Sequence, residues 1–210
     1  MVKVYKVNPE KPPRSIIESV IEVLRKGGVV VYPTDTVYGV GGDPFNENVI
    51  DRIFVIKRRS GKPLPILVSS IDVVLEIAYV SDTALRLMEY FWPGPLTLVL
   101  PLKEGKIPRK LTLGTGKIGV RMPAHKIPLL LAKGLTGAII GTSANISGRP
   151  APRTAEEALR EIGELVDVVL DGGPTPGGLP STVVEVIDDK IRVLREGPIS
   201  LGKIRSVLKK

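Results

Sequence analysis

Cysteine and glutamine are absent from the 210-residue sequence, and histidine occurs only once. Without cysteine, the chain can form neither a disulfide framework nor a thiolate metal site, and it has no cysteine nucleophile. The single histidine, His125, excludes metal sites and proton relays that need two histidines. Lys126 follows His125 and a proline stands at position 128, a pattern more typical of a turn or a helix start than of a catalytic group.

A long apolar segment is also missing from the chain. No apolar run approaches the roughly 20 residues that a membrane-spanning helix needs, and the first 15 residues lack the apolar core of a secretion signal. We therefore expect a cytoplasmic protein that is not inserted in a membrane. The length and the hydrophobic share of 43% are those of a globular chain, and we expect residues 1–210 to form a single domain.

Basic residues outnumber acidic residues by 30 to 22, which gives a net charge of +8. This excess favours anionic partners such as nucleotides or RNA, although a basic balance can also serve solubility alone. Aromatic residues make up only 4% of the chain, which is few for a protein that stacks many bases. The charge therefore leaves a nucleotide-using enzyme and a basic RNA-binding module both open.

Strand-like and helix-like segments alternate along the chain, which predicts an α/β fold with one large, twisted mixed β-sheet flanked by helices. We expect strands at Val2–Val7, Val29–Tyr32, Ile66–Val68, Leu96–Leu102, Ile118–Arg121, Ala138–Gly141, Val166–Leu170, Thr182–Ile187 and Lys190–Leu194. We expect helices at Ser15–Lys26, Val49–Arg58, Asp82–Phe91, Pro128–Lys133, Thr154–Ile162 and Ser200–Leu208. Ser15 with Glu18, and Thr154 with Glu157, have the spacing of capping boxes. Val29–Tyr32 is continuously apolar, as in a central strand covered on both faces.

Four segments at strand or helix ends carry small polar residues followed by a turn. They are YPTDTVYGVGG (32–42), KRRSGKP (57–63), GTSANISGRP (141–150) and GGLPSTVVEV (177–186). Ligands of open α/β sheets bind beyond strand ends, where small residues let the backbone approach the ligand. Any one of these segments could be an ordinary turn, but four in one chain favour a ligand site. Asp35, in the first segment, is a candidate general base without a visible partner.

The usual nucleotide and catalytic patterns are absent, and cations and hydroxyls remain. The chain has no GxxxxGK[ST] loop, and the glycine-rich GTGKIG (114–119) has the wrong spacing for one. Lys57, Arg58 and Arg59 lie at a predicted helix end, where they could also serve the helix dipole. Arg121 and Arg195 lie at predicted strand ends. Such a set without a nucleophile suits transfer of a phosphoryl or nucleotidyl group, in which charge stabilisation does most of the catalysis.

Five motifs occur in the order that is found in the YrdC-like family, the threonylcarbamoyl-AMP synthases. They are YPTDTVYGVGG, FWPGPLTLVL, GVRMPAH, GTSANISGRPAP and LPSTVVEV. The sequence resembles this family from about Ser15 to Pro198. The resemblance implies an α/β fold around a large, positively charged cavity. It also implies the condensation of L-threonine, bicarbonate and ATP, with Mg²⁺, to L-threonylcarbamoyladenylate and pyrophosphate. A separate transferase then moves the threonylcarbamoyl group onto tRNA.

The resemblance also implies roles for nine residues. Thr34, Arg121 and Ser181 match positions that hold threonine. Lys57 and Arg59 match the catalytic K-x-R pair, which faces the phosphates of ATP. Thr115, Ser143, Asn145 and Arg195 match further positions on the nucleotide side. No metal site of the protein itself is implied.

The comparison with the family does not define the roles of two residues. Tyr38 could be a cavity wall or a core residue. Leu67 stands where many family members have a histidine that contacts threonine, so the departure bears on the choice of substrate. Two rival functions also remain: the carbamoyl adenylation that related domains perform in hydrogenase maturation, and the RNA-binding module.

Overall fold

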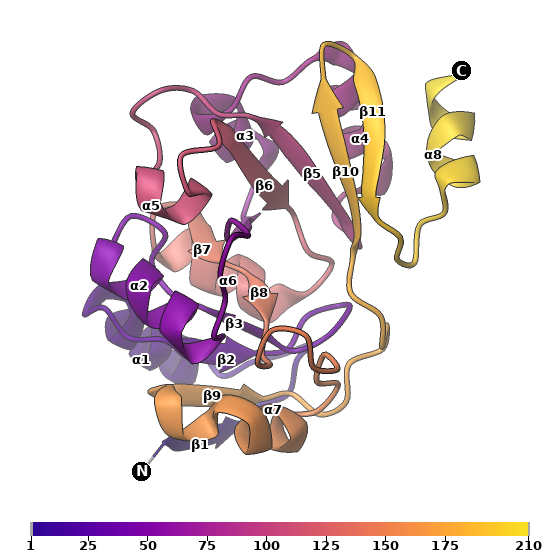
Figure 1. The fold of residues 1–210 in the computed structure, drawn as a ribbon. Coiled ribbons are helices and arrows are strands. Elements are labelled where there is room, and N and C mark those ends of the chain that lie inside the picture. Colours follow the sequence, from indigo (N-terminus) through magenta and orange to yellow (C-terminus); the bar gives the residue numbers. More distant parts are fainter. Residues whose placement is uncertain (1, 210) are drawn as a thin grey trace.

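The β-strands form two mixed sheets in the computed structural model, which describes residues 2–209 (Figure 1). The five-stranded sheet has the order β1-β9-β2-β3-β8, with β1 (Lys3–Lys6), β2 (Val30–Tyr32), β3 (Gly39–Gly41), β8 (Thr142–Ser143) and β9 (Val168–Asp171). The six-stranded sheet has the order β11-β10-β5-β6-β4-β7, with β4 (Ile66–Val68), β5 (Leu96–Pro101), β6 (Lys117–Arg121), β7 (Ala138–Ile140), β10 (Thr182–Ile187) and β11 (Lys190–Arg195).

The helices flank both sheets, so the predicted α/β class is confirmed. They are α1 (Arg14–Arg25), α2 (Glu47–Ile56), α3 (Ile71–Ile77), α4 (Asp82–Phe91), α5 (Arg109–Thr112), α6 (Lys126–Gly134), α7 (Ala155–Ile162) and α8 (Leu201–Leu208), with a 3₁₀ turn at Gly163–Leu165. Helix α1 packs against α6, and α4 packs against α8. Helix α7 lies beside β9 at the end of the molecule that also carries β1 (Figure 1).

The prediction of one large sheet is wrong. Strand β9 pairs with β1 and β2 in the five-stranded sheet, and residues 172–181 then cross to β10 in the other sheet (Figure 1). Twisted open sheets rarely exceed about 10 strands without splitting, and the described strands together would exceed that. The crossing segment contains the GGLP residues of the fourth polar segment, which places this segment between the two sheets.

The predicted strands and the six predicted helices all occur, with ends shifted by a few residues. Besides the 3₁₀ turn, four short elements were not predicted, namely β3, β8, α3 and α5. Strands β3 and β8 lie inside the polar segments 32–42 and 141–150 and pair with each other, Gly39 opposite Ser143 and Val40 opposite Thr142. Sequence patterns missed them because a strand of two or three residues shows no periodicity of its own.

The two predicted capping boxes have different outcomes. Thr154 Oγ1 accepts a hydrogen bond from the backbone N–H of Glu157, and the Glu157 carboxylate accepts one from the backbone N–H of Arg153, so this N-terminus is capped from both sides. The box at Ser15 and Glu18 is wrong, because α1 begins one residue earlier, after Pro13, without a side-chain cap. Glu18 instead accepts a hydrogen bond from Arg14.

Strand β2 is buried on both faces, as its continuous apolar sequence predicts. Val31 belongs to the larger apolar cluster, which fills the space toward α2 and the six-stranded sheet. Val30 and Tyr32 belong to a second cluster with residues of α1 and α6. Burial on both faces fixes β2, and with it the polar segment that begins at Tyr32, at the centre of the molecule.

Strand β3 of the five-stranded sheet lies in close contact with β7 of the other sheet at Gly41. The N–H of Ile140 on β7 donates to the carbonyl of the neighbouring Gly42 over 2.9 Å. A Cβ atom at Gly41 would lie 1.7 Å from the carbonyl oxygen of Ile140. Only glycine therefore permits this contact between β3 and β7, on which the shape of the space between the sheets depends.

We expect Gly41→Ala to lower the free energy of unfolding by about 3 kcal/mol or more, because backbone atoms rather than a flexible side chain must move. Gly202→Ala is a matched control, since Gly202 is exposed on α8 and an added Cβ would meet only Ser200 Oγ, at an ordinary contact distance of 3.9 Å. This control should be neutral or stabilise the protein by up to about 1 kcal/mol. Urea unfolding of both variants measures the difference. Equal unfolding midpoints would contradict the close approach.

Candidate functional site

The four polar segments meet at a cavity of about 670 Å³ between the two sheets. Each segment contributes lining residues: Thr34, Thr36 and Tyr38 from the first, Arg59 and Pro63 from the second, Gly141, Thr142 and Ser143 from the third, and Pro180 and Ser181 from the fourth. A volume of this size is typical of small-molecule sites. The segments that are separated in sequence thus form one candidate site.

One face of the six-stranded sheet forms the floor of this cavity. Alternate residues of three strands line it: Thr97 and Val99 on β5, Lys117, Gly119 and Arg121 on β6, and Val183 and Glu185 on β10. This alternation follows from the pleat of a strand, in which residues i and i+2 face the same side. Arg121 and Ser181 were found by motif, and the same period of two indicates the rest.

Seven of the nine residues that the sequence indicated line this cavity. They are Thr34, Arg59, Thr115, Arg121, Ser143, Ser181 and Arg195. The remaining two, Lys57 and Asn145, are not among the lining residues, and both are buried, with 1% and 4% of their surface exposed.

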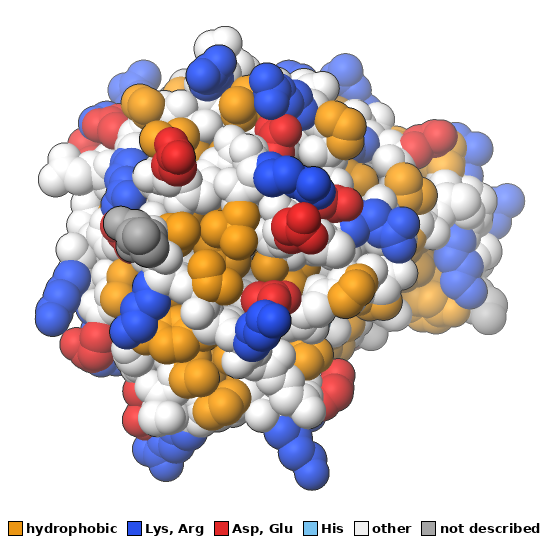
Figure 2. Space-filling view, turned by 90° about the horizontal axis from the view of Figure 1, so that it is seen from below, with side chains coloured by type: hydrophobic (Ala, Val, Ile, Leu, Met, Phe, Trp, Pro, Cys, Tyr) orange, Lys and Arg blue, Asp and Glu red, His pale blue; other side chains and the backbone are white. Residues whose placement is uncertain are grey.

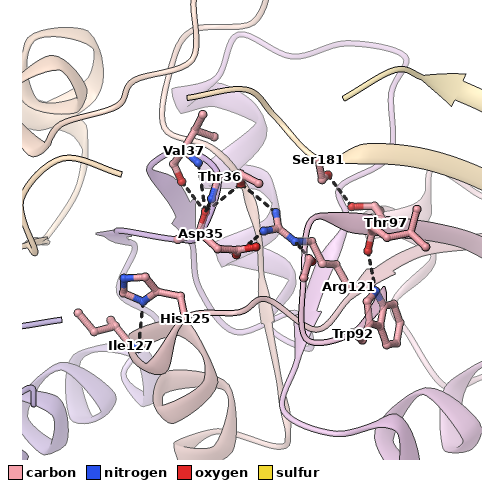
Figure 3. Close-up of polar contacts among 12 residues, drawn as sticks. Asp35, Thr36, Val37, Trp92, Thr97, Arg121, His125, Ile127 and Ser181 are labelled. Carbon is pink, nitrogen blue, oxygen red and sulfur yellow. Dashed lines mark hydrogen bonds and ion pairs between the residues drawn. The ribbon is translucent and has the colours of Figure 1, made fainter. Parts of the chain in front are cut away.

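Arg121 is held at the cavity by contacts on three of its N–H groups. Its Nε donates to the carbonyl of Gly94 over 3.0 Å, its Nη1 donates to Thr36 Oγ1 over 3.0 Å, and its Nη2 donates to Asp35 (Figure 3). A guanidinium has five N–H groups, so two have no acceptor within residues 2–209. An incoming carboxylate could therefore bind this fixed, buried cation.

Asp35 supports Arg121 from outside the cavity. Its Oδ1 accepts from Arg121, its Oδ2 is buried without a hydrogen-bond partner in the described chain, and the residue does not line the cavity. Burial lowers the pKa of Arg121, while the Asp35 carboxylate acts in the opposite direction. The structure thus places Asp35 to orient and neutralise Arg121, and gives no support to Asp35 as a base acting on a substrate.

Ser181 connects Arg195 to the floor of the cavity. The hydroxyls of Ser181 and Thr97 are 2.8 Å apart (Figure 3), and Arg195 donates to the Ser181 carbonyl over 3.0 Å from Nε and 2.8 Å from Nη2. Burial lowers the pKa of Arg195, and the charge of Arg121 lowers it further. The positive charges of Arg195 and Arg121 are therefore close enough to interact electrostatically.

Arg59 fixes its own turn beside the cavity. It donates to the carbonyls of Lys62 over 2.8 Å and Pro63 over 2.7 Å. Burial lowers the pKa of Arg59, and the charge of Arg195 lowers it further. Because Arg195 disfavours the charged form of Arg59 and Arg121 disfavours that of Arg195, an anion among these arginines would be bound favourably.

Thr34 and Thr115 use their hydroxyls within their own turns. Thr34 Oγ1 donates to the carbonyl of Val37 over 2.7 Å, and Thr115 Oγ1 donates to the carbonyl of Thr112 over 2.9 Å. Thr34 Oγ1 also accepts from the backbone N–H groups of Thr36 over 3.1 Å and Val37 over 3.3 Å, so its hydrogen bonds are all made within its own turn. Among the described residues, Thr115 Oγ1 accepts only from the N–H of Lys117 and keeps a second acceptor site.

Lys57 holds the third polar segment from behind. It caps the C-terminus of α2, and its Nζ donates to the carbonyls of Ser143 over 2.5 Å and Asn145 over 2.8 Å. Burial, with the nearby charge of Arg59, lowers the pKa of Lys57 to about 7. In this structure the direct contacts of Lys57 are with the loop that carries Ser143, and its role toward phosphates stays a prediction.

The pKa of Lys57 predicts a pH dependence of stability. The unfolded chain binds the Lys57 proton up to a pKa of about 10.4, whereas the folded chain releases it near pH 7. The unfolded state therefore binds more protons in this window, and the free energy of unfolding should rise with pH by up to about 1.4 kcal/mol per unit. We expect Lys57→Met to remove this rise between pH 7 and 9. Chemical unfolding across this range measures it, and parallel pH profiles for both proteins would contradict it.

Three residues that the sequence left open are now placed. Tyr38 is both a cavity wall and a core residue: it is fully buried, lines the cavity, and donates to the Gly173 carbonyl over 2.7 Å. Leu67 lines the cavity next to Arg121, its partner on the neighbouring strand. His125 caps the start of α6 by accepting from the N–H of Ile127 over 3.3 Å, which confirms the helix-start interpretation (Figure 3).

Two absences apply to the described part of the chain. Within residues 2–209, none of the helices combines the length and the apolar character needed to cross a bilayer. The same residues contain no group of three or more His, Cys, Asp or Glu side chains that could hold a metal ion.

Fold and site together define an α/β protein in which a cavity between two mixed sheets is lined by three arginines and several hydroxyls. A family model described as "Telomere recombination", for Sua5, YciO and YrdC proteins, matches residues 22–197. The chain belongs to this Sua5/YciO/YrdC family.

Two similar proteins carry the same description of their activity. A threonylcarbamoyl-AMP synthase of Pyrococcus abyssi is 39% identical over 88% of this chain and 55% of that protein. A putative threonylcarbamoyl-AMP synthase of Methanocaldococcus jannaschii is 35% identical over 97% of this chain and 96% of that protein. The chain thus spans about half of the first relative and nearly the whole of the second.

Two solved structures are similar over nearly the whole chain. P. abyssi Sua5 complexed with L-threonine has a TM-score of 0.92 and 37% identity, with coverage of 98% of this chain and 60% of that chain. E. coli YciO has a TM-score of 0.88 and 28% identity, with coverage of 97% of this chain and 100% of that chain.

Proposed function

We propose that this protein is a threonylcarbamoyl-AMP synthase, which condenses L-threonine, bicarbonate or CO2, and ATP to L-threonylcarbamoyladenylate and releases pyrophosphate. The observation that carries the proposal is that Arg59, Arg121 and Arg195 line one cavity between the sheets. A triphosphate and an amino-acid carboxylate are both anionic, and a single cavity with several fixed cations suits holding them together. The names of the two relatives support the same activity.

The cavity has a proposed threonine end. Arg121 would clamp the carboxylate with its two spare N–H groups, because a guanidinium binds carboxylates in a forked geometry. Ser181 would supply a neutral hydrogen bond, and Thr34, whose hydroxyl bonds within its own turn, would contact threonine as part of the cavity wall. Leu67 lies beside Arg121 on the adjacent strand and would contact the methyl group of threonine. One methyl group in an apolar pocket distinguishes threonine from serine by about 1–3 kcal/mol.

The remaining part of the cavity has a proposed role in binding ATP. Arg59 and Arg195 would contact the phosphates, and Thr115 and Ser143 would contact the nucleotide. Lys57 and Asn145 are buried behind Ser143, where Lys57 binds both backbone carbonyls. We therefore assign them the indirect task of holding the Ser143 loop in its binding conformation. Mg²⁺ would enter with ATP and reduce the charge of its phosphates.

The reaction would proceed in two bond-forming steps within this cavity. The neutral amine of threonine attacks the carbon of CO2 and loses a proton to solvent, or attacks the carbon of bicarbonate with loss of water, and forms a carbamate in either case. A carbamate oxygen then attacks the α-phosphorus of ATP, and the bond to the β-phosphate oxygen breaks to release pyrophosphate. Arg59 and Arg195 would stabilise the charge that develops on the leaving group. Keeping the carbamate next to ATP would limit its loss to water.

The proposed setting of the reaction is the cytoplasm, with the chain acting as one domain. The adenylate would pass to a separate transferase that modifies tRNA. The rival reading as an RNA-binding module needs a basic surface. On the face seen in Figure 2, basic and acidic side chains are interspersed with hydrophobic ones, and no uniformly basic field covers it.

Pyrophosphate release tests the proposal. Purified protein with ATP should release pyrophosphate only when threonine and bicarbonate are both present, and it should need no tRNA. Omission of each substrate in turn is the control. Pyrophosphate release that does not depend on threonine but requires carbamoyl phosphate would favour the carbamoyl adenylation of hydrogenase maturation. Salt-sensitive RNA binding without turnover would favour the RNA-binding module.

A further inference from the structure

An ion pair inside the cavity has no role in the assignments above. Lys117 Nζ and Glu185 Oε1 are 2.7 Å apart, and both side chains line the cavity. Glu185 is the only carboxylate among the described residues that line it. Its side chain is 16% exposed, so this charge is largely removed from water. A carboxylate kept in a cavity of arginines suggests a ligand that carries hydrogen-bond donors.

The pair lies at the end of the cavity remote from Arg121. Lys117 and Arg121 are four residues apart on β6, which corresponds to about 13 Å along a strand. Glu185 is opposite Val99 on β5, and Val99 is opposite Gly119 on β6, so the backbone of Glu185 is level with the middle of β6. Its carboxylate contacts Lys117, which lies two residues from Thr115, and this contact puts the charge of Glu185 on the proposed nucleotide side.

An apolar surface adjoins the ion pair. Between Val183 and Val184 the register with β11 shifts, so that Val183 is opposite Arg195 and Val184 is opposite Val193. Leu194, the extra residue at this bulge, lines the cavity although 46% of its surface is exposed. Val183, Val99 and the bare backbone of Gly119 continue this surface across the floor. It is suited to a flat ring or a sugar ring.

The chemistry of Glu185 narrows the choice of ligand. An ionised carboxylate accepts about four hydrogen bonds, and Lys117 is the only described donor to this one. An ammonium group would also be attracted, but a carboxylate would keep the threonine amine protonated and thus unreactive toward CO2. A neutral vicinal diol supplies two donors without this conflict. In ATP this group is the pair of 2′ and 3′ hydroxyls of the ribose.

We propose that Glu185 and Lys117 form a ribose subsite, in which the Glu185 carboxylate accepts hydrogen bonds from the 2′ and 3′ hydroxyls of the nucleotide. Lys117 orients the carboxylate and balances its charge. Leu194, Val183 and Val99 contact the apolar faces of the nucleoside. The subsite gives the protein a preference for ribonucleotides over deoxyribonucleotides. This proposal rests on the proposed use of ATP.

Binding of ATP and of 2′-deoxy-ATP to the whole protein tests the subsite. The wild-type protein should bind ATP about 10-fold to 100-fold more tightly, because hydrogen bonds to a charged group are strong. Glu185→Ala should weaken ATP binding by a similar factor and weaken 2′-deoxy-ATP binding by a smaller factor, because that nucleotide keeps only the 3′ hydroxyl, so the preference for ATP should disappear. A merely structural role of Glu185 would instead weaken both nucleotides equally. Glu10→Gln, in an exposed ion pair with Lys126, is the matched control.

The outcomes separate the subsite from the proposed function. Suppose that the wild-type protein releases pyrophosphate with threonine, and that the wild-type protein and the Glu185→Ala variant prefer ATP over 2′-deoxy-ATP to the same extent. This result overturns the subsite and leaves the proposed function intact. A weaker threonine affinity in this variant, with an unchanged ATP affinity, also overturns it. A loss of ribose preference in Glu185→Ala, with a normal threonine requirement, supports it. If the wild-type protein binds neither nucleotide, both the proposed function and the subsite fail.

Discussion

Replacing Arg121 by alanine is expected to raise the KM for threonine by about 100-fold or more, with little change in the KM for ATP. The guanidinium is buried and fixed by Gly94, Thr36 and Asp35, so its two spare N–H groups are oriented before the substrate arrives. Loss of one partner of a buried, hydrogen-bonded charge pair costs about 2–5 kcal/mol. Arg121→Lys should recover only part of the loss, because an ammonium cannot bind bidentately.

The stability of this variant needs its own control. Without Arg121, the Asp35 carboxylate would be a buried and unpaired charge, which costs about 3–5 kcal/mol of folding free energy. The double variant Asp35→Asn with Arg121→Ala removes that charge, so it should regain stability without regaining threonine affinity. Steady-state kinetics with varied threonine and varied ATP, together with thermal unfolding, separate the two effects. Equal increases in both KM values would contradict the carboxylate clamp.

Replacing Arg59 by alanine is expected to reduce the rate of pyrophosphate release by about 100-fold or more. Arg59 lines the cavity near Arg195, and each would offset charge that builds on the leaving phosphates. Losing one such contact typically costs 10²–10³ in turnover, about 2.7–4 kcal/mol. The turn at residues 59–63 would also lose two backbone hydrogen bonds, so the fold must be checked by circular dichroism.

Arg58 offers the matched control for this prediction. It carries the same charge one residue earlier, but it is exposed and does not line the cavity. Arg58→Ala should therefore leave pyrophosphate release nearly unchanged at physiological salt. A similar loss in both variants would mean that general positive charge, and not the position of Arg59, determines the rate.

Much of the fold could be predicted from local patterns. The apolar run at Val29–Tyr32 and the capping box at Thr154 depend on neighbouring residues alone, and both were predicted correctly. The division into two sheets depends on which strand β9 chooses as its partner, and no local pattern encodes that choice. Strand β3 exists because Gly39–Gly41 can approach β2 and β8 closely, which is likewise a tertiary effect.

The position of a site residue could be predicted from the sequence where its residue type and place in the chain suggest a single role. Arg121 and Ser181 at strand ends do line the cavity. The burial of Lys57 could not be predicted in this way, because a lysine at a helix end is expected to face solvent or a ligand. Its burial depends on the carbonyls of Ser143 and Asn145, which approach it only after the chain has folded. Glu185 was missed because an alternating acidic residue in a strand is usually a solvated one, and only the second sheet makes its surroundings a cavity.

A structure of the protein with L-threonine and a non-hydrolysable ATP analogue would show whether one cavity binds both substrates. We expect both ligands in the cavity between the sheets, with the threonine carboxylate on Arg121, the phosphates near Arg59 and Arg195, and the amine facing the α-phosphate. Ligands bound on separate faces of the molecule, or threonine bound away from Arg121, would contradict it.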